Sequence, residues 1–346
     1  MTNELGSASR AELLHAARSG DEDAFRRLVD PHLAELRAHC YRMLGSFQDA
    51  EDALQDALLG TWRGLSGFEG RSSVRSWLYK IVTNACLKAI ERRPTRVLPV
   101  DFGAAADPHE DPSEPIAESV WVDPYPAGQL GLDDGLAGAE ARYEQRESVE
   151  LAFVAALQHL PARQRAVLIM REVLGFSGGE VAAALDTTPA SVYSALQRAH
   201  KAIDERLPEQ SQQATLRSLD DERVRRLAED YVEAWERSDV DALVALLADD
   251  AAMAMPPRPT WYRGREAIAA FLRRVPLAGE LRSRLIPVDA NGQVAFGHYT
   301  WDEESRRFTA HGVNILTLRG SKIDVITTYL SPDTLERFGL PAELPA

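Results

Sequence analysis

The sequence predicts a multidomain protein in which two all-α domains precede a C-terminal α+β domain. Apolar residues in segments 11–93 and 142–207 recur at helical spacing, with few prolines or glycines to interrupt them. From Leu281 onward the sequence favours strands and contains two hairpin signals, Asn291-Gly292 and Arg319-Gly320-Ser321-Lys322. A length of 346 residues suggests two or three domains, and a hydrophobic content of 45% excludes disorder of the whole chain.

The charge is unevenly distributed along the chain. A formal net charge of -14 argues at first against a nucleic-acid partner, because cationic side chains supply most nonspecific DNA affinity. Segment 97–141, however, holds ten acidic residues and no lysine or arginine, whereas segment 71–96 holds seven basic residues and one acid. A strongly cationic segment therefore lies within an acidic protein.

The sequence carries no membrane or metal signal. Its apolar runs are shorter than the roughly 18 residues that span a bilayer, and the N-terminal text is polar and acidic. The two cysteines, Cys40 and Cys86, form no CxxC motif and no disulfide framework. We therefore expect a cytoplasmic protein with no metal, no cofactor and no membrane partner.

The first predicted domain, residues 10–96, ends in the basic segment. A helix would space its cations along one strip, and Trp77 and Asn84 lie among them. Aromatic rings stack on unpaired bases, and asparagine hydrogen-bonds base edges. The alternative interpretation is a solvated basic helix face. The candidate DNA contacts are Arg71, Ser72, Ser73, Arg75, Trp77, Lys80, Asn84, Lys88, Arg92 and Arg93.

These residues carry a family resemblance. The text GRSSVRSWLYKIVTNACLKAIERR, residues 70–93, resembles the promoter −10 recognition segment of extracytoplasmic-function (ECF) sigma factors of the sigma-70 family. The resemblance implies a loop at 70–73 that captures a flipped base of the melted strand, with Asn84 nearby. The preceding segment 49–62 resembles the helix that docks on the β′ clamp helices of core RNA polymerase. The residues implied in that contact are Asp49, Glu51, Asp52, Gln55, Asp56 and Trp62.

Residues 97–141 have the Pro, Gly, Asp and Ala content of a flexible acidic linker. One apolar island interrupts it, and an exposed Trp and Tyr in a linker need a docking surface. We expect the island to dock on the first or the third domain and to set the separation of the two DNA-binding domains. The island residues with this regulatory role are Trp121, Pro124, Tyr125 and Pro126.

Residues 142–207 predict a second helical domain with a helix-turn-helix. Thr188 can cap the last helix and Pro189 fits its first turn. A helix-turn-helix would insert the N-terminus of its last helix into the major groove of DNA. The alternative interpretation is an ordinary helical hairpin without a DNA-binding role. The segment resembles region 4 of ECF sigma factors, which reads the −35 element. The candidate contacts are Arg171, Thr188, Ser191, Tyr193, Ser194, Gln197, Arg198 and Lys201.

The last helix departs from the commonest family pattern. Many members carry basic residues near the position of 193–195, where this chain is neutral. We therefore expect weaker binding or a different base preference at −35. The text SVYSALQRAHKAI, residues 191–203, and the linker island resemble instead the SigG- and SigJ-type subgroup of actinobacteria, which has a C-terminal extension.

Residues 219–338 predict the α+β domain. Segments 219–248 and 261–274 have helical patterns, and antiparallel strands follow. The text over about 220–335 resembles the SnoaL-like or NTF2-like family, a cone of helices around a curved sheet with an apolar cavity. The apolar segment at Met255 lacks the carboxylate base that isomerases of this family need, so we expect no enzyme activity. Polar residues that can line a pocket are Tyr231, His298, Tyr299, His311 and Asn314, although satisfied structural roles are the commoner outcome.

Three functional hypotheses follow. The leading one is an ECF sigma factor that binds core RNA polymerase (β′ clamp helices and β flap) and promoter DNA, is monomeric when free, and is regulated in cis by its C-terminal domain. The alternative is a one-component DNA-binding regulator that senses a small ligand in the C-terminal cone. An isomerase or cyclase with helical appendages is the third.

Overall fold

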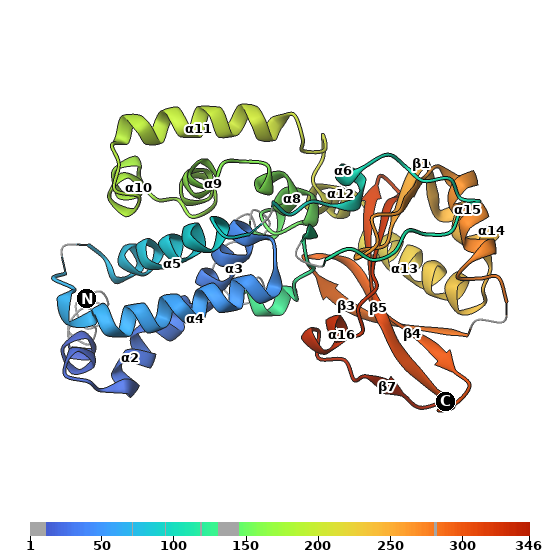
Figure 1. The fold of residues 1–346 in the computed structure, drawn as a ribbon, viewed down its shortest axis with the longest axis horizontal. Helices are drawn as coiled ribbons and strands as arrows, with labels where there is room; N and C mark the ends of the chain where they lie inside the picture. Colours follow the sequence, from blue (N-terminus) through green and yellow to red (C-terminus); the bar gives the residue numbers. More distant parts are fainter. Residues whose placement is uncertain (1–11, 71, 94, 118–119, 131–144, 280–281) are drawn as a thin grey trace. The chain divides into compact units, whose positions relative to one another are not determined.

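The computed structural model describes residues 12–70, 72–93, 95–117, 120–130, 145–279 and 282–346, which form two compact units (Figure 1). The first unit comprises residues 1–95, 129–131 and 156–206, and the second comprises 96–128, 132–155 and 207–346. The division differs from the predicted boundaries, because most of the predicted linker and the start of the predicted second domain group with the C-terminal domain. Residues 131–144 of those segments lie outside the described residues.

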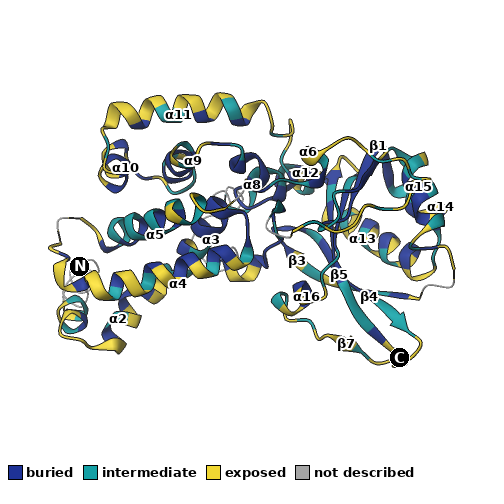
Figure 2. Cartoon of the chain, in the orientation of Figure 1, coloured by how far each residue is buried: buried dark blue, intermediate teal, exposed yellow. Residues whose placement is uncertain are grey.

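The N-terminal part of the first unit is a set of helices: α2 (Glu22–Val29), α3 (Leu33–Leu44), α4 (Phe47–Gly64) and α5 (Val74–Ile90). Side chains of Asp21, Ser46 and Ser73 cap α2, α4 and α5 by accepting from backbone N–H groups of the first turn. Gly45, with φ of 65°, ends α3 in the left-handed conformation that glycine adopts at little cost. Buried side chains on these helices include Leu36, Met43, Leu54, Leu78 and Val82. Figure 2 shows in dark blue the buried stretches of α3, α4 and α5.

The second half of the first unit contains the predicted helix-turn-helix. It consists of α9 (Ala162–Leu168), a π-helical turn (Ile169–Val173), α10 (Gly178–Ala184) and α11 (Pro189–Asp204), after α8 (Leu151–Gln158). Ser177 and Glu180 form a reciprocal capping box at α10. Thr188 caps α11 and Pro189 occupies its first turn, as the sequence predicts.

The second unit places helices on a curved mixed sheet. The helices are α12 (Gln212–Ser218), α13 (Asp221–Glu236), α14 (Val240–Leu246), α15 (Arg265–Arg274) and α16 (Asp333–Arg337). The strands are β1 (Leu247–Ala254), β2 (Trp261–Arg263), β3 (Ser283–Ala290), β4 (Gln293–Asp302), β5 (Arg307–Arg319), β6 (Lys322–Tyr329) and β7 (Glu343–Leu344). Their order is β2-β1-β6-β5-β4-β3, with β7 on β5. Both predicted hairpins are present, with Asn291 at φ 56° and Gly292 at φ 67°.

Two strands were not expected from the sequence. Segment 261–263, the start of the helix predicted over 261–274, forms β2 because it pairs antiparallel with β1, and helix α15 begins only at Arg265. Segment 247–254 forms β1, which pairs antiparallel with β2 and parallel with β6, although the predicted sheet was antiparallel. Its Ala- and Asp-rich text has low strand propensity, so pairing on both sides determines its conformation. Met253 and Met255 contribute to the core that the helices cover, where Tyr262 stacks on Phe271 at a centroid distance of 4.4 Å.

No helix within the described ranges is long and apolar enough to cross a membrane.

Candidate nucleic-acid interface and docked linker

The N-terminus of α5 holds the loop that the sequence predicts as a base-capturing site. Ser72 and Ser73 are exposed, and Ser73 Oγ accepts from Ser76 N at 3.0 Å. The ring of Trp77 lies against Phe68 at a centroid distance of 4.6 Å, so the structure gives it an intramolecular stacking partner. Arg71 lies outside the described residues.

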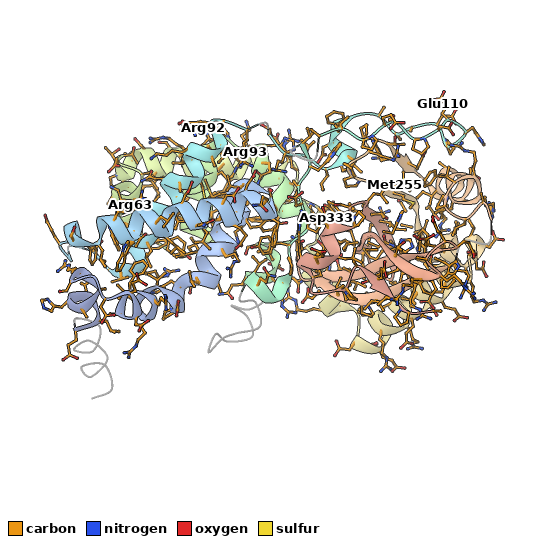
Figure 3. All side chains as sticks on the ribbon, turned by 60° about the horizontal axis from the view of Figure 1, so that its bottom comes forward. Arg63, Arg92, Arg93, Glu110, Met255 and Asp333 are labelled. Carbon is orange, nitrogen blue, oxygen red and sulfur yellow. The ribbon has the colours of Figure 1, made fainter. Side chains whose placement is uncertain are left out.

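A groove of about 490 Å³ runs between α4 and α5. Asn84, Lys88 and Arg92 line its α5 side, while Asp52 and Asp56 line its α4 side. Arg92 and Arg93 follow the C-terminal end of α5 and are exposed (Figure 3). The arrangement offers cations for phosphates beside donors and acceptors for base edges.

The predicted polymerase-binding residues of α4 do not form one face. Asp49 is only 3% exposed and pairs with Arg93, because the 3.6-residue period turns this position inward; it is a structural residue. Asp52 and Asp56 face the α5 groove. Glu51, Gln55 and Trp62 line a second groove of about 630 Å³ together with α2. Glu51 accepts from Arg37 at 2.8 Å.

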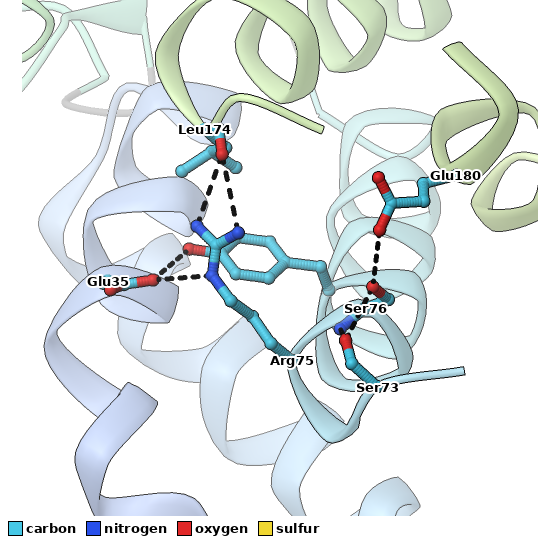
Figure 4. A network of polar contacts seen from close by, with 7 residues as sticks. Glu35, Ser73, Arg75, Ser76, Leu174 and Glu180 are labelled. Carbon is cyan, nitrogen blue, oxygen red and sulfur yellow. Dashed lines mark hydrogen bonds and ion pairs between the residues drawn. The ribbon is translucent and has the colours of Figure 1, made fainter. Parts of the chain in front are cut away.

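Two predicted DNA-binding cations contact the helix-turn-helix, and Figure 4 shows the contacts of one of them, Arg75. Lys80 Nζ donates to Asp186 Oδ1 at 2.7 Å and to the carbonyl of Ala183 at 3.0 Å. Arg75 donates to Glu35 Oε2 at 3.2 Å and to the carbonyl of Leu174 at 3.4 Å.

A third polar contact lies beside them. Ser76 Oγ donates to Glu180 Oε1 at 3.3 Å. Hydrogen bonds from the backbone and side chain of Ser177 hold the pKa of Glu180 below its ordinary value, which keeps the carboxylate ionised.

Buried side chains between the N-terminal helices and the helix-turn-helix accompany these polar contacts. Tyr79 of α5 and Phe176 form an edge-to-face pair at 5.1 Å. Arg165 is 4% exposed and donates to the carbonyls of Met43, Gln158 and Leu160. The Met43 carbonyl lies at the end of α3 and the Gln158 carbonyl at the end of α8, where carbonyls lack helical partners.

The other face of the helix-turn-helix is open. Tyr193 is 53% exposed, which is unusual for a large ring without a partner surface. Arg171 donates to the carbonyl of Phe176, and its guanidinium lies 6.0 Å from the centre of the Tyr193 ring. Thr188 is occupied as the helix cap. The exposed α11 positions that the sequence predicts as −35 contacts are Ser191, Tyr193, Ser194, Gln197, Arg198 and Lys201.

The apolar linker island is docked on the C-terminal domain. Trp121 is 2% exposed, and its indole Nε1 donates to the carbonyl of Pro257 at 3.0 Å. Arg96, counted in the basic segment, is also buried and donates to the carbonyl of Trp121 at 2.7 Å. Pro124 lines a small cavity with Trp121 and Pro256. The docking surface that the sequence left open is therefore the third domain in this structure.

The acidic part of the linker is fastened by arginines. Arg274 Nε donates to the carbonyl of Pro108 at 3.0 Å, and Arg274 pairs with Asp111 at 2.7 Å. It also donates to the carbonyl of Glu110, which is labelled in Figure 3. Arg258 donates to the carbonyl of Ser113 at 2.6 Å. The sequence missed these arginines, because nothing local distinguishes them from other surface cations.

A buried carboxylate fastens the chain just before the helix-turn-helix domain. Glu150 is 3% exposed and accepts from the backbone N–H groups of Gln212 and Gln213 at 3.0 and 2.7 Å. Burial raises the pKa of Glu150 to about 7, against the opposing effect of these two hydrogen bonds. The Gln213 amide donates to the carbonyl of Gly292. The sequence carried no signal for this contact.

The predicted pocket residues are mostly paired within the core. Asn314 donates to Tyr231 Oη at 3.1 Å, and His298 Nε2 lies 3.1 Å from Ser283 Oγ. Tyr299 donates to the carbonyl of Pro341 at 2.8 Å, and the His311 ring lies 5.0 Å from that of His298. Burial lowers the pKa of His298 to about 3, so its ring is neutral.

Comparisons with known proteins match each part of the chain. Residues 28–95 match Sigma-70 region 2, residues 150–203 match Sigma-70 region 4, and residues 228–326 match the SnoaL-like domain. The fold and these matches define a transcription initiation factor of the sigma-70 class with a SnoaL-like extension.

The relatives specify the family. The chain is 38% identical over 342 residues to the ECF RNA polymerase sigma factor SigG of Mycobacterium tuberculosis, covering 95% of this chain and 89% of that one. It is 32% identical over 191 residues to SigM of the same species, covering 55% and 81%. The crystal structure of the M. tuberculosis sigma factor SigJ matches with a TM-score of 0.56 at 18% identity, over 93% of this chain and 100% of that one. The chain belongs to the ECF RNA polymerase sigma factors, which direct transcription initiation and act with core RNA polymerase and promoter DNA.

Proposed function

We propose that the C-terminal domain regulates this sigma factor in cis by holding the linker between its two DNA-binding regions. The observation that carries the proposal is the burial of Trp121, whose indole bonds to Pro257 of the C-terminal domain. Region 2 and region 4 are joined only through this linker along the chain. A domain that binds the linker therefore limits how far the two regions separate.

The entry into region 4 supports the same proposal. Region 4 matches from residue 150, and Glu150 is the residue that accepts from Gln212 and Gln213. Tyr125 and Asn291 form another tie between the linker and the C-terminal domain. The chain is thus held after region 2 and again before region 4.

For promoter DNA, we propose that α5 contacts the −10 element and α11 the −35 element. The groove lined by Asn84, Lys88 and Arg92 supports the first assignment, and the exposed face of α11 supports the second. We assign core polymerase to the groove face of α4 and α2 that includes Gln55 and Trp62, with Asp49 excluded. With these partners, we propose a cytoplasmic location for the protein.

Sigma factors are not enzymes, and we propose that the SnoaL-like domain is no exception here. The apolar segment at Met255, which is buried in the core of the domain and labelled in Figure 3, supplies no carboxylate base of the kind that an isomerase needs. The pairing of Tyr231 with Asn314 supports a structural role for both. A groove of about 620 Å³ between α13 and strands β3 and β4, with Leu285 and Phe296 in its lining, supports uptake of an apolar ligand by this domain.

The test is run-off transcription with core polymerase and the full-length protein carrying Trp121→Ala. Trp301→Ala, in β4 and stacked beside Phe308, is the matched control. We expect Trp121→Ala to change the promoter-specific transcript about tenfold, in the same direction as removal of residues 219–346, since loss of a buried tryptophan anchor costs at least about 1.4 kcal/mol. Transcription equal to that of Trp301→Ala contradicts the proposal.

A further inference from the structure

We propose that region 4 masks the −10 helix of the free protein, with the carboxylates of Glu180 and Asp186 taking the place of DNA. The inference rests on the assignment of α5 to the −10 element. It names an interaction between the two DNA-binding regions that is separate from the docked linker.

The contacts involve two residues that are predicted to bind DNA, Arg75 and Lys80, and the neighbouring Ser76. Lys80 donates to Asp186 at 2.7 Å. Ser76 donates to Glu180 at 3.3 Å (Figure 4). A carboxylate oxygen resembles a phosphate oxygen in charge and in accepting hydrogen bonds. While these bonds persist, the N-terminal half of α5 cannot offer the same donors to a DNA strand.

The surface of region 4 that covers α5 is a packed interface with buried side chains on both sides. Tyr79 and Phe176 are 0% and 3% exposed and pair at 5.1 Å, and Arg75 lies 4.6 Å above the centre of the Phe176 ring. Arg165 buries its guanidinium against carbonyls that include Met43 at the end of α3. The apolar pair and the buried arginine supply most of the stability of the interface, because partly exposed ion pairs such as Lys80–Asp186 contribute little.

The closed form, in which region 4 covers α5, is too small to contact both promoter elements at once. A compact unit of about 150 residues has a radius of gyration of about 15 Å. The −10 and −35 elements lie about 25 base pairs apart, or about 85 Å at 3.4 Å per base pair. One compact unit cannot contact both, so regions 2 and 4 separate before the promoter is bound. The mask is removed in the same step.

The face of α11 stays free while α5 is masked. Ser191, Ser194 and Arg198 are exposed in the closed unit. The free protein is therefore expected to contact duplex DNA through region 4 and to bind single-stranded DNA poorly through region 2.

The test variant is Glu180→Gln combined with Asp186→Asn in the full-length protein. Glutamine preserves the capping box with Ser177, and asparagine tolerates the positive φ of 50° at position 186. The control is Glu172→Gln with Glu205→Gln, which removes the same charge; Glu172 lies 3.8 Å from His200, and Glu205 follows α11.

The first readout is acylation of Lys80 by a water-soluble N-hydroxysuccinimide ester, followed by mass spectrometry with exposed Lys88 as the internal standard. The second is anisotropy of a labelled 12-nucleotide single strand of mixed sequence. Loss of two contacts of this kind predicts that Lys80 acylation and strand affinity each rise about three- to tenfold relative to the control pair.

Unchanged Lys80 acylation overturns the mask, whatever the DNA result. Faster acylation with unchanged strand affinity overturns the claim that the mask competes with DNA. In that case Asn84→Ala, assayed in the polymerase holoenzyme, decides separately whether α5 binds the −10 element at all.

Discussion

Tyr125 and Asn291 exchange two hydrogen bonds. Tyr125 N donates to Asn291 Oδ1 at 2.9 Å, and Asn291 N donates to the carbonyl of Tyr125 at 3.0 Å. The Asn291 amide also donates to the carbonyl of Val149 at 2.7 Å. One hairpin residue therefore binds the linker on one side and the chain that enters region 4 on the other.

Substitution of Asn291 tests this tie. Asn291→Gly keeps the positive φ of the turn and removes only the side-chain bonds, so it separates hydrogen bonding from backbone strain. We expect urea unfolding to show a loss of about 2–3 kcal/mol, because buried backbone groups of Tyr125 and Val149 lose their partners. Wild-type stability in Asn291→Gly would show that the side chain does not fasten the linker.

Glu150 predicts a pH dependence of stability. The pKa of its carboxyl is about 7 in the folded protein and about 4.5, its ordinary value, in the unfolded chain. Between these two pH values the folded state therefore retains a proton that the unfolded chain releases. The free energy of unfolding therefore falls as the pH rises from about 4.5 to 7, by about 3 kcal/mol at most.

The measurement is the difference between wild type and Glu150→Gln in urea unfolding at pH 5 and pH 8. Glutamine keeps an acceptor for Gln212 or Gln213 without a charge. We expect Glu150→Gln to gain stability relative to wild type at the higher pH. A difference that is constant with pH contradicts the assignment.

Because the exposed face of α11 is neutral, an added positive charge there should strengthen the binding of duplex DNA. Ser194→Arg places a cation on the exposed face of the helix, and we expect duplex affinity to rise and the slope of log K against log salt to steepen by about 0.9. Ser305→Arg, in the exposed β4–β5 turn, adds the same charge far along the chain. Equal slopes for the two variants would exclude α11 as a DNA-binding face.

We expect the substitution Asn84→Ala to reduce open-complex formation. Asn84 lines the groove between α4 and α5, where loss of a base-edge contact costs about 1–3 kcal/mol. Potassium permanganate footprinting of holoenzyme with Asn84→Ala should show about fivefold or greater loss of melted DNA. The exposed Gln210→Ala is the control. Full melting with Asn84→Ala would refute the −10 assignment.

Local signals predicted much of the fold. The Thr188-Pro189 pair marks the start of α11, and Asn291-Gly292 marks the β3–β4 turn, because capping and turn geometry depend on adjacent residues. The family and its function followed from the same text and are confirmed by the relatives.

Contacts between distant residues were not predictable. Nothing near Trp121 indicates that Pro257 accepts its indole proton, and nothing near Lys80 indicates Asp186. From the sequence alone Asp49 is expected at a polar surface, but in the structure the segment around α5 covers it and Arg93 pairs with it. These residues became buried or paired through tertiary structure, which overrides local propensity.

The most direct test of regulation through the linker is a double-mutant comparison in promoter-specific transcription. Four proteins are assayed with core polymerase: wild type, Trp121→Ala, a chain ending at residue 208, and that shorter chain with Trp121→Ala. If Trp121 acts by docking on the C-terminal domain, Trp121→Ala changes the transcript of the full-length protein and leaves that of the shorter chain unaltered. An equal effect of Trp121→Ala in both chains would contradict regulation through the docked linker.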